Sequence, residues 1–146
     1  MGTHSTIKFY TKHNKCILAI YNQYDGYITG EGANIYEFFK SEKSKGNGFD
    51  DIALLYVLYK KEGPYHTYAT TEQDTQEYNY EIYDTDEGIK ITIKEEHYYE
   101  EKDEWALTTT LRYGTLEDLK HYIDEETIKE KGIVNNEWIK RNRTFI

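Results

Sequence analysis

The chain has 146 residues, a formal net charge of −9 and one cysteine, Cys16. This length predicts one domain, and a single cysteine excludes an intrachain disulfide. No secretory signal begins the chain and no apolar run reaches the ~20 residues of a membrane span, so we expect a cytoplasmic protein (host cytoplasm if it is viral) without a membrane partner. Tyrosine is abundant, at 16 residues, and this side chain serves half-buried strands, interfaces and ligand walls alike.

The negative charge is concentrated in one stretch. Residues 72–104 contain 13 acidic and 3 basic side chains. Such a stretch repels phosphate backbones, so nucleic acid is not expected as a partner. Two interpretations of the stretch stay open: a solvated outer face of a sheet, or a docking surface for a basic partner.

The chain begins with a pattern that predicts a β-hairpin. Residues 6–10 alternate apolar and polar side chains, residues 11–15 are polar turn formers, and residues 16–21 are mostly apolar. We therefore expect two paired strands, the second buried on both faces.

Two helices are expected next. Apolar residues at helical spacing predict the first over residues 35–43. The second is expected over residues 52–61, where Asp50 or Asp51 can cap its start and a Gly-Pro pair ends it. Because the second helix is apolar all round, we expect it at the centre of the fold.

From residue 78 onward, apolar residues recur at every second position. Residues 78–82 and 89–93 alternate on either side of an 84–88 turn, which predicts a second hairpin. Residues 105–111 predict one more strand, which ends at Gly114.

The last part of the chain is expected to be helical. Thr115 and Asp118 resemble a capping box for a short helix through Tyr122, and one or two short helices are expected after it. The fold class is α+β: a single domain with a mostly antiparallel sheet, two central helices and a short helical C-terminal tail, divided into a core of residues 1–123 and a tail of 124–146.

Signatures of known enzyme classes are absent from the sequence. It contains no G-x-S-x-G, Walker A, H-E-x-x-H or C-x-x-C motif, and its five histidines lack metal-ligand spacing. Cys16 opens an apolar stretch, which is typical of a packed, unreactive thiol. We therefore expect no catalytic residue, no metal site and no cofactor.

Two weak signals each have a structural alternative. The pairs Glu95-Glu96 and Glu100-Glu101 place adjacent carboxylates on opposite faces of an extended segment, so they form either a loose metal site with Asp103 or solvated charge. The chain also opens with a myristoylation-like pattern at Gly2, which has no basic patch beside it; the alternative is that this segment leads into the first strand.

A glycine-rich loop is the most informative segment. It joins the expected strand at 16–21 to the first helix and contains aromatic rings, an aspartate and three glycines. A helix start offers free N–H groups to an anion, Gly30 and Gly32 would permit close approach, and tyrosines could stack on a ring. Glu31, however, would put a negative charge where an anion would sit. The alternative is a tight, glycine-dependent turn whose tyrosines close the core.

The same loop carries a resemblance. The segments Gly2-Thr3-His4-Ser5, Ile20 to Tyr27 and Gly30-x-Gly32 resemble a family of small phage and large-DNA-virus proteins that open with M-G-T-R-S and continue with I/L-Y-x-Q-aromatic-D-G-Y-P-x-G-x-G. The likeness covers about half of the chain. His4 replaces the family's usual Arg, and a neutral histidine would bind an anion weakly; Ile28 replaces the usual Pro.

The chain is more distantly similar to anti-Thoeris sponge proteins, which sequester a cyclic-ADP-ribose-type signal. This resemblance implies a non-catalytic viral or phage-type domain that binds a small nucleotide-like ligand at the Asp25–Gly32 loop. The candidate ligand-binding residues are Ser5, Gln23, Tyr24, Asp25, Gly26, Tyr27, Thr29, Gly30 and Gly32.

Two other functions remain as alternatives. The first is a homo-oligomer, or a protein that binds a virion or host partner, because the acidic stretch and the basic Trp138-to-Arg141 segment could pair between subunits. The second is a hydrolase that uses carboxylates with a metal.

Overall fold

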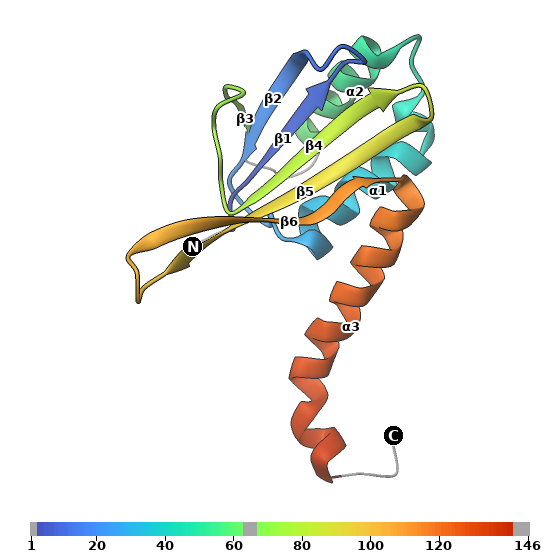
Figure 1. Ribbon diagram of the computed structural model, residues 1–146. Coiled ribbons are helices and arrows are strands. Elements are labelled where there is room, and N and C mark those ends of the chain that lie inside the picture. The colour runs from blue at the N-terminus through green and yellow to red at the C-terminus, as the bar shows by residue number, and fades with distance from the viewer. Residues whose placement is uncertain (1–2, 63–66, 142–146) are drawn as a thin grey trace.

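The computed structural model describes residues 3–62 and 67–141, with side chains up to residue 131. Its six strands form one mixed sheet in the order β3-β2-β1-β4-β5-β6 (Figure 1). Their bounds are β1 Ser5–Tyr10, β2 Cys16–Asn22, β3 Thr67–Ala69, β4 Tyr78–Thr85, β5 Gly88–Tyr99 and β6 Glu104–Gly114. Strands β1 and β4 are parallel, and all other neighbours are antiparallel. The predicted α+β class is confirmed.

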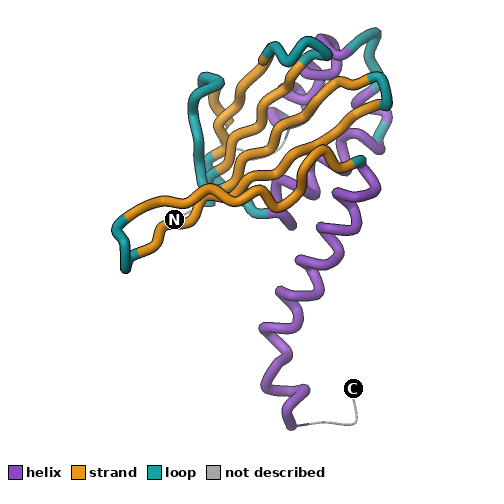
Figure 2. The backbone as a smooth tube through the Cα atoms, viewed as in Figure 1, coloured by secondary structure: helices purple, strands orange, loops and turns teal. Residues whose placement is uncertain are grey.

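The helices lie mainly on one face of this sheet, as Figure 2 shows. Their bounds are the π-helical turn η1 Ile28–Gly32, α1 Ala33–Lys40, the 3-10 turn η2 Glu42–Ser44, α2 Phe49–Lys61 and α3 Leu116–Arg141. Helices α1 and α2 cover the sheet, while α3 follows its edge strand and leaves the body of the domain (Figure 1).

The core forms where the sheet meets α1 and α2. Alternate residues of the central strands are completely buried there, such as Phe9 of β1 and Tyr80 of β4. The Phe9 ring lies 5.6 Å from the Tyr56 ring of α2, which in turn lies 5.0 Å from Phe38 of α1. Several of the abundant tyrosines therefore belong to aromatic clusters that hold the two layers together.

Helix α2 differs from its prediction in one respect. Its inner face buries Ala53, Tyr56 and Lys60, but Leu54 and Leu58 are 61% and 52% exposed. The helix packs against the core, as the prediction of a central helix requires, but protein covers only one of its sides. A lysine, which the apolar pattern would place outside, occupies the buried face instead.

The start of α3 is capped as the sequence predicted. The Thr115 N–H donates to the Asp118 carboxylate at 2.9 Å, and the Asp118 N–H donates to the Thr115 hydroxyl at 3.1 Å. The helix continues without a break for 26 residues, so the expected short helix and helical tail are one element. At 1.5 Å per residue it is roughly 39 Å long. Among the described residues, no helix is both long and apolar enough to cross a membrane.

Strands β5 and β6 extend beyond their neighbour β4. The β4–β5 ladder ends at the Tyr78–Glu95 pair, whereas β5 and β6 stay paired out to Tyr99 and Glu104. Residues 96–107 therefore form a projecting two-stranded arm, here named the hairpin arm, which is plain in Figure 1.

Candidate functional site

The glycine-rich loop closes on itself through its own backbone. Asp25 adopts the left-handed region, with φ 56°, and its carbonyl accepts the Glu31 N–H at 2.8 Å, while the Gly30 N–H donates to the Tyr27 carbonyl at 2.9 Å. A Cβ on Gly30 would overlap the Asp25 carbonyl oxygen. Glycine is needed at this position for the turn itself, and two N–H groups that an anion would use are already bonded.

Gly26 brings the loop against the sheet. Its N–H donates to the Thr3 carbonyl at 2.9 Å, and its own carbonyl accepts the Tyr80 hydroxyl at 2.7 Å. A Cβ at Gly26 would lie 2.8 Å from atoms of His4 and Ser5. Gly26 therefore permits close contact between the loop and strands β1 and β4.

Glu31 points into the protein and not toward a ligand. Its side chain is completely buried, and one carboxylate oxygen lies 2.5 Å from the buried Lys60 ammonium and 3.1 Å from the Asn22 amide nitrogen. The other oxygen accepts the Tyr56 hydroxyl. The expectation that Glu31 would repel an anion at the loop was wrong, because the turn rotates the carboxylate inward.

This buried cluster perturbs the titration of its members. Burial raises the pKa of Glu31, while the charge and hydrogen bond of Lys60 and the Tyr56 hydroxyl oppose that rise. Burial and the neighbouring carboxylate raise the pKa of Tyr56 well above its usual value. A buried ion pair with hydrogen-bonded oxygens fixes the loop on α2, and no open face of it is available to a substrate.

The remaining predicted site residues divide between interior and surface. Ser5 is completely buried beneath Gly26, and its hydroxyl has no hydrogen-bond partner among the described residues. Asp25 and Tyr27 are exposed and joined by a 3.0 Å hydrogen bond. The other positions lie as follows: Gly32 is buried, Gln23, Thr29 and Gly30 are intermediate, and Tyr24 is exposed. Gly2 lies outside the described residues.

A second charge cluster, which the sequence analysis missed, lies on the sheet face opposite α1 and α2. The Glu81 carboxylate is 3.2 Å from the Lys94 ammonium and accepts the Tyr83 hydroxyl at 2.9 Å. The Lys8 ammonium donates to the Asp74 carbonyl at 2.6 Å, and burial lowers the pKa of this lysine. The period-two pattern of β1, β4 and β5 places these residues on one face, and that signal was readable.

Neither cluster supplies an evident catalytic couple. The Cys16 thiol donates to the Leu18 carbonyl at 3.4 Å, and burial raises its pKa, which disfavours the reactive thiolate. Among the side chains of residues 3–62 and 67–131, no group of three or more His, Cys, Asp or Glu residues is placed to hold a metal ion.

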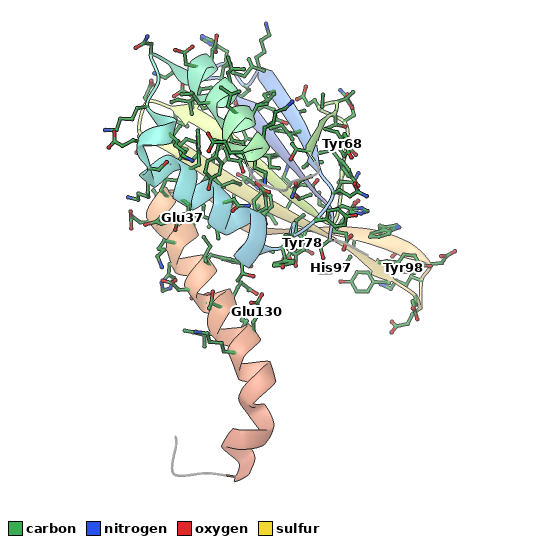
Figure 3. All side chains as sticks on the ribbon, turned by 180° about the vertical axis from the view of Figure 1, so that it is seen from behind. Glu37, Tyr68, Tyr78, His97, Tyr98 and Glu130 are labelled. Atoms are coloured by element: carbon green, nitrogen blue, oxygen red, sulfur yellow. The ribbon has the colours of Figure 1, made fainter. Side chains whose placement is uncertain are left out.

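The most exposed aromatic surface lies on the hairpin arm. Tyr98 and Tyr99 are each 44% exposed, Trp105 is 59% exposed and Leu107 is 54% exposed. The arm also carries five carboxylates and one lysine. Figure 3 shows His97 and Tyr98 projecting from it, away from the packed body. The sequence indicated the acidic charge, but not that this hairpin outruns the sheet.

Comparison with known proteins adds no relative: no family model matches the chain, and no curated protein or solved structure matches it significantly.

Proposed function

We propose that the chain is a non-catalytic binding domain whose hairpin arm recognises a protein partner. The observation that supports it most directly is the exposure of Trp105 and Leu107, with Tyr98 on the same face, on an arm rich in carboxylates. Contiguous exposed apolar side chains with a charged rim are typical of interaction surfaces. The chemistry of this surface fits a partner segment that combines apolar and basic side chains.

The backbone of the arm supports the same function. Strand β6 is the last strand of the sheet, and an edge strand presents unpaired N–H and C=O groups that can pair with an added strand. Residues 104–109 continue the ladder with β5 in regular register, whereas the register shifts near Ile93 and Ile91. The regular outer part of β6 is therefore the segment best suited to strand addition.

Peptide binding tests this function. A fluorescent peptide of alternating arginine and phenylalanine is titrated into the full chain, beside a peptide in which glutamate replaces arginine. We expect binding of the basic peptide only, and Trp105→Ala/Leu107→Ala to weaken it by about 10-fold or more. The matched control is Leu54→Ala/Leu58→Ala, an equally exposed apolar pair on α2. Equal binding of both peptides, or equal losses in both variants, would contradict the proposal.

A second candidate function is capture of a small nucleotide-like ligand at the Asp25–Gly32 loop. It is favoured by Tyr24 and Tyr27, which are 43% and 38% exposed beside the exposed Asp25, and by the resemblance to sponge proteins. Calorimetry with a nucleotide panel that includes cyclic ADP-ribose tests it. Tyr27→Ala should abolish the binding heat without lowering Tm, while Tyr68→Ala on β3 should leave it intact. A panel without any binding heat would remove this candidate.

A further inference from the structure

A groove of about 400 Å³ runs between the hairpin arm and the segment that precedes β4. Its lining residues are His4, Thr75, Gln76, Glu77, Glu96 and Trp105. One indole ring and two carboxylates thus face a single space. An aromatic face attracts a guanidinium or ammonium group, and carboxylates accept hydrogen bonds from it. The chemistry of the groove is that of a receptor for a basic side chain.

The wall formed by residues 75–77 is held rigidly on the sheet. The buried Asn79 amide accepts the Gln76 N–H at 2.8 Å and donates to the Gln76 carbonyl at 2.7 Å. The Thr6 hydroxyl donates to the same Asn79 oxygen at 2.8 Å. The Glu77 carbonyl accepts the Glu96 N–H at 2.9 Å, which ties this wall to the arm. A receptor built in advance loses little entropy when it binds.

The opposite wall is also supported. The Trp105 ring lies 5.4 Å from the Tyr98 ring, and the Tyr98 hydroxyl donates to the Asp103 carboxylate. These contacts orient the indole while 59% of Trp105 remains exposed. The groove therefore offers an aromatic face that is positioned but uncovered.

We propose that this groove receives the basic C-terminal segment of a second copy of the chain, an inference that rests on the proposed function of the arm. Residues 138–146 contain three basic side chains, Lys140, Arg141 and Arg143, and no acidic one. Four apolar residues accompany them: Trp138, Ile139, Phe145 and Ile146. This composition complements the groove and arm, which carry five carboxylates, Glu77 and exposed aromatic rings.

The architecture favours a second copy over the same chain. Helix α3 starts where β6 ends, and it carries the C-terminal segment away from the arm, so the two projections diverge in Figure 1. If two copies exchange their C-terminal segments reciprocally, they form a closed dimer, whereas a one-way exchange adds further copies to an open chain.

Charge reversal in the full chain tests the contact by sedimentation velocity over a concentration series. The tail-reversed variant is Lys140→Glu/Arg141→Glu/Arg143→Glu, and the groove-reversed variant is Glu77→Lys/Glu96→Lys. We expect the wild type to self-associate, less so at high salt, and each variant to weaken association by about 10-fold or more. The chain that carries both sets should recover association at the groove, because the reversed tail and positions 77 and 96 again carry opposite charges. This recovery also shows that the reversals leave the fold intact.

The control is Lys15→Glu/Lys45→Glu/Lys61→Glu, which changes net charge as much as the tail reversal but on exposed positions outside the groove. It should associate like the wild type. A wild type that stays monomeric at every concentration, or a control that weakens as much as the tail variant, would overturn the inference. If the arginine–phenylalanine peptide still binds a monomeric wild type, only the second-copy inference fails; if it does not bind, the proposed function fails as well.

Discussion

Replacing Lys60 with methionine tests whether the buried Glu31 carboxylate depends on its ion pair. Methionine keeps most of the length and apolar volume of lysine and removes the ammonium 2.5 Å from the carboxylate. Tyr56 and Asn22 still donate to Glu31, but no counter-ion is left in this cluster. The variant therefore isolates the effect of an uncompensated buried charge from the effect of a cavity.

The expected loss is large relative to the stability of a domain. Removing one partner of a buried pair costs about 3–5 kcal/mol, against a total of about 5–15 kcal/mol for a typical domain. Both side chains are completely buried, so solvent screening does not reduce this figure. Adding Glu31→Gln to Lys60→Met removes the stranded charge and keeps an acceptor, and the double variant should lose less than Lys60→Met alone.

The assay is urea unfolding of the wild type, both single variants and the double variant. In Lys60→Met the pKa of Glu31 rises further, because the attraction that opposed burial is gone. The folded state then holds a proton that the unfolded chain releases above its ordinary pKa of 4.5, so stability falls as pH rises through this window. The destabilisation of Lys60→Met should accordingly be smaller at acidic pH than at neutral pH.

Two results would refute this reasoning. One is a loss below about 1 kcal/mol in Lys60→Met, a value typical of an exposed pair. The other is strict additivity of the two substitutions, because residues that share one charge network should show a coupling energy of about 0.5–3 kcal/mol.

Two further predictions concern local geometry. Gly30→Ala should destabilise the domain by about 1–3 kcal/mol, because its Cβ would overlap the Asp25 carbonyl. Gly32→Ala should be neutral or stabilise the domain by up to about 1 kcal/mol, because the nearest atom to its Cβ is 3.5 Å away and the backbone is already helical. Equal losses of Tm in the two variants would contradict this prediction. The Thr115 N–H lowers the pKa of Asp118, so the cap weakens as pH falls through the Asp118 titration, and the Tm difference between wild type and Asp118→Ala should shrink in acid rather than stay constant.

The sheet was largely readable from the sequence because its strands alternate. Ile91 and Ile93 face α1 and α2, while Thr92 between them faces the other side, and this period fixes strand and register together. Strand β3 was missed since three residues are too few to show a period. The end of β4 relative to β5 was also unpredictable, because nothing in the alternation of β5 indicates where its partner stops.

The site was harder to predict than the fold, because the direction in which the Glu31 side chain points cannot be inferred from the sequence of the loop. The Asp25–Gly32 loop shows which residues are small and which are charged, but not that Glu31 turns inward toward Lys60, 29 positions later. The only local hint was a lysine at an apolar position of α2. A carboxylate and an ammonium so far apart in sequence form a pair only after the η1 turn packs against α2.

The structure separates the residues of the glycine-rich loop into those that the fold requires and those that are exposed. Gly26, Gly30 and Glu31 are required by the close approach to β1, the turn and the buried ion pair, so any domain with this turn needs them whether or not it binds a ligand. Tyr24 and Tyr27 are largely outside the packed core. Substitutions at the first set report on folding, and only the exposed tyrosines can separate ligand capture from stability. The same division makes the hairpin arm informative, since its exposed apolar side chains contribute little to the core and substitutions there test the proposed partner surface with little effect on stability.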